Sequence, residues 1–486
     1  MKKIFIIITL SALALCSCIN DLDVTQESKL TSSDMWKTEA DATGAMYGLF
    51  HQVRAAYQTV LIYWGDFRAG TFKDGAGTSG AANKMFNNQL DATETKGTNW
   101  ASSYTAINEA NLMIKHVPSI QFSNQDTRNR VLGSAYFVRA LLYFNLARVF
   151  GDVPILLDGF ESDQADLQPA REDVSLVLDQ VLKDIEMAES YMPASVKDPT
   201  TANLMAIKML KADYWLWMAK TRGGGADAVK NARKALNNVI INADVSLMDN
   251  YADVFDINKK NNREMIFVMH FGQGEYEGGW GSTWLIPTSR WYGKDADIEK
   301  NCKLMNDNDQ RYIFSDSMLS LIRADASDTR IPVNYGDWTD PADGRNYTWI
   351  NKYAGLWEDN RRYFIVDEPI YRYAEALLMM AEVELASGNN SAALDYVNMV
   401  AKRAYKKDNY YTDSSDAAVK NAIIDEYMKE FAAEAKTWWV YIRMGVVFER
   451  VASLTGRESE KNVLLWPITD ACFLENPNMT QTEGYY

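Results

Sequence analysis

The sequence predicts a mainly α-helical protein, in which tetratricopeptide-like helix pairs form a scaffold that carries one irregular, loop-rich insertion. Three observations support this prediction. Apolar residues recur at helical spacing on both sides of a Gly turn in 371–403, and the same spacing returns in 202–241. Between Met265 and Asp367 the helical periodicity fades, while Gly, Asp, Asn and Pro accumulate. With 486 residues, 47% of them hydrophobic, the chain can bury a large core.

The first residues have the composition of a targeting segment. Two lysines precede the apolar stretch Ile4 to Leu15, which is too short to span a bilayer. The sequence Leu15-Cys16-Ser17-Cys18 resembles a bacterial lipobox, and we predict cleavage after the small Ser17. Residues 1–17 are then a lipoprotein signal peptide, Cys18 is the lipidated first residue, and 18–30 form a tether. A plain secretory signal is the alternative.

Residues 31–264 form the expected N-terminal helical part. Thr38 to Val53 is amphipathic, and 134–150 is apolar nearly all round and stops at Gly151, which predicts a helix buried on most sides. Residues 202–220 and 226–241 make another helix pair, interrupted by three consecutive glycines. The spacing of Ala232, Leu236 and Val239 repeats that of the later helix pair, which indicates internal repetition.

Residues 265–367 form the loop-rich insertion and the expected ligand-binding region. Met265 to Phe271 is an expected strand, and six of the fourteen Trp residues lie between Trp280 and Trp357. Sugar rings have apolar faces and hydroxyl rims, so a carbohydrate site needs exposed aromatic rings with polar neighbours. Four aromatic residues in Gly-rich or Arg-containing surroundings are therefore candidate ligand contacts: Trp280, Trp284, Trp291 and Tyr292. The alternative is that these rings belong to the core.

Residues 368–486 form the C-terminal helical part and tail. Two helices are expected in 371–403, with Pro369 in the first helical turn and Gly388 at the end of the first helix. A further helix is expected over Ile423 to Arg443.

Several passages of the chain resemble the SusD/RagB-like family of outer-membrane nutrient-binding lipoproteins. Residues 372–382 match the Arg-x-Ala-Glu-x-Leu-Leu-Met-x-Ala-Glu motif of that family, and shorter matches occur throughout the chain, at 139–154, 328–330, 352–353, 426–443, 465–468 and 476–485. The chain differs from the family pattern at Ala435, Thr437 and Val440, where Gly, Arg and Asp are usual. We interpret these differences as changes to a structural ion pair and not to the ligand site.

The resemblance implies a function as well as a fold. It implies a protein that is lipid-anchored in the outer membrane, faces the cell exterior, and captures an oligosaccharide without chemistry for a SusC-type TonB-dependent transporter. In such proteins the ligand site is shared between the insertion and the loops after the first helices, which adds Trp64, Arg68, Phe72 and Asp74 as candidates. Oligopeptide capture, a glycoside hydrolase on a helical scaffold, and a scaffold without a small ligand remain alternatives.

Other functions are disfavoured by the sequence. A net charge of −15 without long basic runs argues against nucleic acid as a partner. The glycines of 75–80 fit a dinucleotide fingerprint, but no apolar strand precedes them. The three His residues are far apart, and the nucleophile and metalloprotease motifs are absent. We therefore expect no metal, no cofactor and no enzymatic activity.

Overall fold

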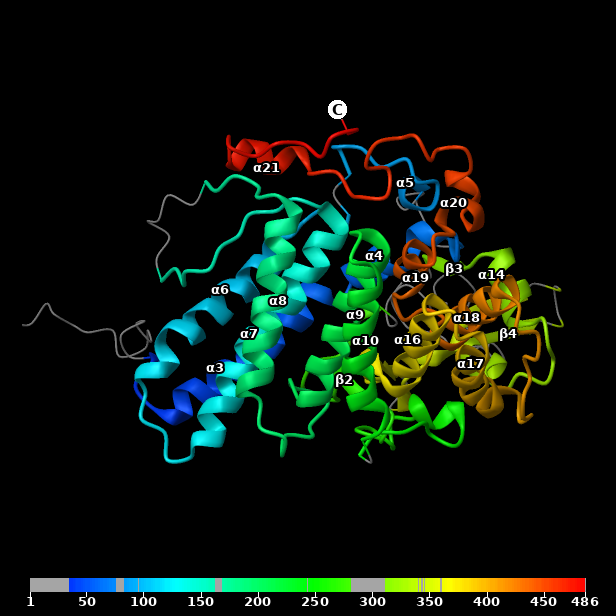
Figure 1. Ribbon diagram of the computed structural model, residues 1–486, viewed down its shortest axis with the longest axis horizontal. Helices are drawn as coiled ribbons and strands as arrows, with labels where there is room; N and C mark the ends of the chain where they lie inside the picture. The colour runs from blue at the N-terminus through cyan, green and yellow to red at the C-terminus, as the bar shows by residue number, and fades with distance from the viewer. Residues whose placement is uncertain are drawn as a thin grey trace, which may run out of the picture.

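The chain folds into a row of packed helices with a few short strands (Figure 1). The computed structural model describes residues 35–75, 83–94, 96–161, 168–242, 244–280, 311–339, 341, 344, 346–358 and 361–485. The long helices are α3 (Glu39–Tyr57), α6 (Ala101–His116), α7 (Gln125–Phe150), α8 (Val174–Tyr191), α9 (Leu204–Thr221), α10 (Gly225–Ile240), α16 (Tyr373–Ala386), α17 (Asn390–Tyr405) and α18 (Asp416–Glu430).

Short helices and turns connect these elements. The short α-helices are α4 (Val60–Gly65), α5 (Asn83–Phe86), α14 (Asp316–Ile322), α15 (Ile331–Asn334), α19 (Thr437–Arg443), α20 (Val447–Arg450) and α21 (Asp470–Glu475). The 3-10 turns are η1 (Phe67–Ala69), η2 (Val117–Ser119), η3 (Tyr251–Val254), η4 (Asn351–Tyr353) and η5 (Ala452–Leu454).

The helices pack as neighbouring pairs. Helix α7 lies beside α8, α9 beside α10 and α16 beside α17, and α10 also contacts α16, so the pairs form one continuous row. Figure 1 shows this row running from α3 and α6 on the left to α16, α17 and α18 on the right. The predicted class, a mainly α scaffold of tetratricopeptide-like helix pairs, is confirmed.

Helix α7 runs through the middle of the core, as its composition predicts. Its first turn is capped by Asn124, whose side chain accepts a hydrogen bond of 2.8 Å from the Asp126 N–H. From Val131 to Phe150 nearly every residue is buried, and the helix ends at Gly151, which has φ 73. A helix without a polar face must be covered on all sides, and here α3, α6, α8 and α9 cover it.

The helix pair α16–α17 has the predicted turn but not the predicted start. Gly388 has φ 75 and ends α16, as expected. Pro369, however, lies in strand β8 and not in a first helical turn, and the helix begins only at Tyr373. The prediction failed because residues 368–372 are buried throughout and pair with strand β2, where Pro369 opposes Val268.

The prediction of one helix over 423–443 is also wrong, because the structure has two helices there. Helix α18 ends at Glu430 and α19 begins at Thr437. Between them lies a turn, residues 431–436, in which Ala433 and Ala435 both have φ 61. This left-handed conformation is unfavourable for any residue with a side chain, so contacts from outside the turn must stabilise it.

The strands form four separate antiparallel ladders among the described residues, and most belong to 265–367. They are β1 (Phe72–Asp74) with β3 (Tyr312–Phe314), β2 (Met265–Met269) with β8 (Glu368–Arg372), β4 (Tyr335–Thr339) with β5 (Asn346–Ile350), and β6 (Leu356–Glu358) with β7 (Arg361–Tyr363). The predicted strand at Met265 is confirmed. Within the same described ranges, the helices are all too short or too polar to cross a membrane.

Candidate functional site

The ladder of β1 and β3 joins the two regions that were expected to share a ligand. Strand β1 follows the first helices, and β3 lies near the middle of the insertion. In the ladder Asp74 opposes Tyr312, and the Gly75 N–H donates a hydrogen bond of 2.6 Å to the Arg311 carbonyl. Asp74 is half-buried and Arg311 is exposed. The structure thus brings the predicted residue Asp74 to an edge that both regions form.

Charged and aromatic side chains surround this edge, which we call the β1–β3 edge. Burial lowers the pKa of Lys96, and the charge of Arg311 lowers it further, while Glu94 and Asp74 act in the opposite direction. Burial also raises the pKa of Tyr63, which lies beside Tyr312. Tyr63, Tyr312 and Glu94 are buried beneath the edge, whereas Asp74, Lys96 and Arg311 are partly or fully accessible to solvent. A carboxylate and two cations at an accessible edge can form hydrogen bonds with ligand hydroxyls.

Three of the residues predicted from the first loops are core residues. Trp64, Arg68 and Phe72 are 0%, 0% and 3% exposed, so the expectation that they present surfaces to a ligand is corrected. The Trp64 indole donates a hydrogen bond of 2.8 Å to the Gly97 carbonyl. Phe72 packs against Phe67 and Phe314.

Arg68 is a cation that the protein itself satisfies. Its guanidinium donates to the carbonyls of Val463, Leu464 and Leu465 and to the Asn88 side chain. It also lies over the Trp438 ring, with its Cζ 4.6 Å from the ring centroid. Arg68 therefore holds residues 463–465 of the C-terminal tail against its own segment, which follows α4.

Trp280 is likewise a core residue and not an exposed platform. It is 1% exposed, and its indole N–H donates a hydrogen bond of 2.9 Å to the Ala433 carbonyl. Gly279 before it allows close packing, because a Cβ at this position, which has φ 90, would lie 2.2 Å from Glu368 Oε1. The remaining candidates, Trp284, Trp291 and Tyr292, lie outside the described residues.

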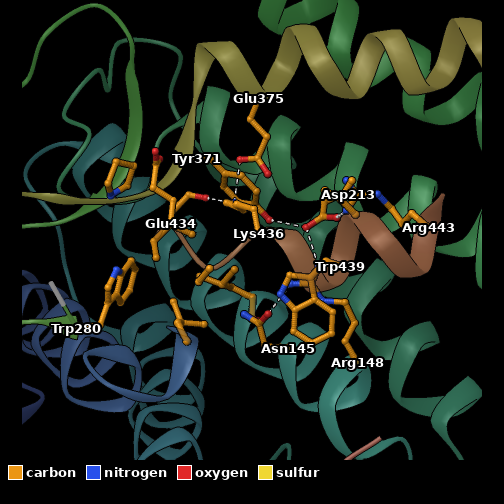
Figure 2. Close-up of a pocket in the computed structure, with 16 residues that line it drawn as sticks. Asn145, Arg148, Asp213, Trp280, Tyr371, Glu375, Glu434, Lys436, Trp439 and Arg443 are labelled. Carbon is orange, nitrogen blue, oxygen red and sulfur yellow. Dashed lines mark hydrogen bonds and ion pairs between the residues drawn. The ribbon is translucent and has the colours of Figure 1, made fainter. Parts of the chain in front are cut away.

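A polar cavity lies between α7, α9, α16 and α19 (Figure 2). Asp213 is at its centre and accepts hydrogen bonds from Arg148 at 3.0 Å, Arg443 at 3.2 Å and Tyr371 at 3.3 Å. The cavity offers about 30 Å³ to water-sized molecules. Since one water needs ~10–15 Å³, the cavity fits two or so waters and no sugar ring.

A larger groove of about 420 Å³ runs along α6, but its polar side chains are already used. Asn108 donates to the Phe160 carbonyl at 3.0 Å and accepts from the Phe160 N–H at 2.8 Å. Asn111 donates to the Leu156 and Asp158 carbonyls. These amides hold the segment 154–160 on the helix and are therefore engaged within the protein.

Residues from four of the family-like passages, at 328–330, 352–353, 372–382 and 426–443, meet in the interior of the protein together with Glu264 and Arg403. The cations Arg330, Lys352, Arg372 and Arg403 pair with the carboxylates of Glu264, Asp328, Glu426, Glu430 and Glu434. No side chain of this set, which we call the buried ion-pair network, is more than 4% exposed. Burial alone raises the pKa of Glu430, but Arg403, Arg372 and Arg330 outweigh it, and the net pKa is lowered.

Sequence reasoning missed Lys96 and Arg311 at the edge, because nothing in the local sequence places residue 96 near residue 311. Within the described ranges there is also no cluster of three His, Cys, Asp or Glu side chains that could hold a metal ion.

The chain matches two family models that follow one another along its length. Residues 22–207 match a model described as "Starch-binding associating with outer membrane", and residues 280–485 match the SusD family. The SusD-like protein P38 of Formosa agariphila is 26% identical over 521 aligned positions, which cover the whole of both chains.

Solved structures agree with these matches. NanU of B. fragilis has a TM-score of 0.81 and 28% identity, with 95% of this chain and 99% of that chain covered. A SusD superfamily protein of Bacteroides vulgatus has a TM-score of 0.80 and 27% identity, with 93% and 100% covered. Given these matches and the shared helical architecture, the chain belongs to the SusD family of nutrient-binding outer-membrane proteins, which work with SusC-type transporters.

Proposed function

We propose that this protein captures an oligosaccharide at the β1–β3 edge and passes it to its transporter without chemical change. The observation that carries the proposal is the β1–β3 ladder, which places Asp74 beside Tyr312 and Arg311. This pairing joins the segment that follows α4, residues 66–75, to the insertion 265–367. The sequence of the insertion supplies Trp284, Trp291 and Tyr292.

The chemistry of the edge suits a sugar. Asp74, Lys96 and Arg311 offer hydrogen-bonding groups that are partly or fully accessible to solvent. Aromatic rings from the insertion would supply flat apolar surfaces for the sugar faces. Trp284, Trp291 and Tyr292 therefore remain the predicted stacking residues, and Asp74 is the predicted hydroxyl-binding residue of the first loop.

The proposed cellular arrangement follows the domain division of the sequence. Cys18 would carry the lipid on the outer face of the outer membrane, and 18–30 would act as the tether. The helical parts 31–264 and 368–486 would form the scaffold, and 265–367 would hold the ligand. The partner would be a SusC-type TonB-dependent transporter, which this protein covers as a lid. A pulldown from outer membranes that recovers the protein without a large β-barrel would count against this partner.

Glycan and peptide arrays test the function on the soluble chain that starts after Cys18. We expect binding to a defined set of oligosaccharides, and loss of the signal in Asp74→Ala. The matched control is Lys402→Ala on α17, which removes the exposed ion pair between Lys402 and Asp408. Binding to peptides alone would replace the proposal by oligopeptide capture. Shorter saccharides released during long incubation would indicate a hydrolase and contradict the proposal.

A further inference from the structure

The 431–436 turn is held by side chains from three distant parts of the chain. Its two left-handed residues, Ala433 and Ala435, are strained. The Ala433 carbonyl accepts hydrogen bonds from the Trp280 indole at 2.9 Å and from the Tyr353 hydroxyl at 3.1 Å. The Ala432 carbonyl accepts one of 2.7 Å from Lys352 Nζ. Both the beginning and the end of the insertion are therefore attached to this turn.

The third attachment comes from the end of α4. Asp66, which is 1% exposed, accepts hydrogen bonds from the Ala435 N–H at 2.9 Å on Oδ2 and from the Thr437 N–H at 3.1 Å on Oδ1. The backbones are in close contact here, because a Cβ on Gly65 would lie 2.0 Å from the Ala435 carbonyl oxygen. Each carboxylate oxygen of Asp66 thus satisfies one N–H of the strained turn or of the first turn of α19.

Asp66 is also the first residue of the segment that leads to the β1–β3 edge. Its own carbonyl accepts hydrogen bonds of 3.0 Å from the Ala69 N–H and from the Thr71 hydroxyl. The Thr71 carbonyl in turn accepts a hydrogen bond of 2.9 Å from the Ser315 N–H, directly after β3. A short series of hydrogen bonds therefore connects the 431–436 turn with both strands of the ladder.

We propose that the charged carboxylate of Asp66 is a positioning group for the β1–β3 edge: it fixes the segment 66–75, and with it Asp74, against the 431–436 turn. The inference rests on the proposed function where it concerns ligand affinity, but the positioning itself does not need a ligand. Charge is essential, since a protonated carboxyl turns one acceptor oxygen into an O–H donor. That donor would face an N–H, and one of the two hydrogen bonds would be lost.

The surroundings of Asp66 place this change in an accessible pH range. Burial raises its pKa to about 6, although hydrogen bonds from the Thr437 N–H, the Thr437 hydroxyl and the Ala435 N–H, and the charge of Lys352, act in the opposite direction. Other ionisable groups near it are Tyr441 on α19, Arg68 on its own segment, and Glu434 of the turn, which pairs with Lys352 at 2.7 Å. The carboxylate is therefore charged at pH 7.5 and mostly protonated at pH 5.

Hydrogen–deuterium exchange on the full soluble chain, corrected for intrinsic exchange rates, tests the inference. In the wild type we expect protection of 66–75 and 431–437 to fall at least tenfold between pH 7.5 and pH 5.0, with α16 and α17 unchanged. In Asp66→Asn the side-chain NH₂ group is a donor, as the O–H of the protonated carboxyl is. We therefore expect low protection from exchange at both pH values.

The matched control is Asp316→Asn, the same chemical change at an exposed carboxylate that pairs with Lys73 of β1 at 2.7 Å. It should keep the wild-type profile. Protection that does not depend on pH in the wild type, or an Asp66→Asn profile equal to the wild type, overturns the inference. The wild-type profile decides by itself if the variant does not fold. If the wild type loses protection at pH 5.0 but binds no glycan, the proposed function is refuted and the positioning role stands. If it binds a glycan but its protection does not change with pH, the positioning role is refuted and the proposed function stands.

Discussion

The buried ion-pair network and the β1–β3 edge are both rich in charge, yet they differ in almost every other respect. In the network each cation has carboxylate partners, and no side chain is more than 4% exposed. At the edge, Asp74 and Lys96 are half-buried and Arg311 is exposed. Four of the family-like passages, at 328–330, 352–353, 372–382 and 426–443, contribute to the network, and none of the passages includes Asp74, Lys96 or Arg311.

This difference has a physical origin. A buried charge that loses its partner costs several kcal/mol, so each residue of the network must have one particular identity at one position. A solvent-accessible edge imposes a weaker requirement, because water can replace a lost partner of an exposed polar group. Motifs in this chain therefore indicate the scaffold, and the ligand site has to be located from the structure.

The largest expected effect is on the network. Arg372→Met removes the cation shared by Glu264, Glu430 and Glu434, and should lower the free energy of unfolding by ~3–5 kcal/mol. Chemical denaturation measures this loss. The control is Arg323→Met, which breaks an exposed pair with Asp337 and should cost no more than ~1 kcal/mol. Equal losses in the two variants would remove the distinction between the regions.

The next effect is acid sensitivity of the network. Because the folded-state pKa of Glu430 is lowered, the stability that it contributes is present above its unfolded pKa, ~4.3, and is lost as the pH falls below it. We expect the free energy of unfolding in urea to fall as the pH is lowered from 5 to 3, with a slope from this group that approaches ~1.4 kcal/mol per pH unit below pH ~4.3. Glu430→Gln should be less stable at pH 7 and show a smaller slope.

At the edge we expect a change in binding and none in stability. Asp74→Ala should weaken binding of the best glycan on the array by roughly tenfold, the equivalent of ~1.4 kcal/mol, which suits one charged hydrogen bond. Titration calorimetry and a thermal melt on the same sample measure both quantities. A lower melting temperature with unchanged affinity would place Asp74 with the scaffold.

The smallest effect concerns the strained turn, where glycine should improve the fold. Ala435 has φ 61, and a residue with a side chain costs ~1–2 kcal/mol there. Ala435→Gly should therefore raise the free energy of unfolding by ~0.5–1 kcal/mol, after the larger entropy of the unfolded chain is subtracted. Ala432→Gly is the matched control in the same turn, at a residue without positive φ, and should be destabilising.

The parts of the fold that were predictable are those fixed by local periodicity. Helical spacing gave α7, α9, α10, α16 and α17, and Gly388 gave the turn between the last two. Pro369 was misplaced because its strand depends on pairing with Val268, about one hundred residues away. The break at 431–436 has no Gly or Pro to mark it, since Ala433 and Ala435 occupy its left-handed positions.

The candidate site was predictable only in outline. The family resemblance made Asp74 a candidate, and its role in ligand binding stays a prediction. The sequence could not show that Trp64 and Trp280 are buried, because a Trp in a Gly-rich stretch has the same local sequence whether its ring faces the core or solvent. Asp66 and Arg311 gave no local signal either, since their roles come from contacts with residues far along the chain.

One measurement tests the separation of scaffold and ligand site most directly: titration calorimetry and thermal melts on Trp280→Ala beside Trp284→Ala and Trp291→Ala. Trp280→Ala leaves a buried cavity and should cost ~3–5 kcal/mol of stability with unchanged affinity in the folded fraction. Trp284→Ala or Trp291→Ala should lose roughly ten- to hundredfold in affinity at an unchanged melting temperature. Weaker binding at an unchanged melting temperature for Trp280→Ala, with no effect of the other two variants on affinity, would contradict the account.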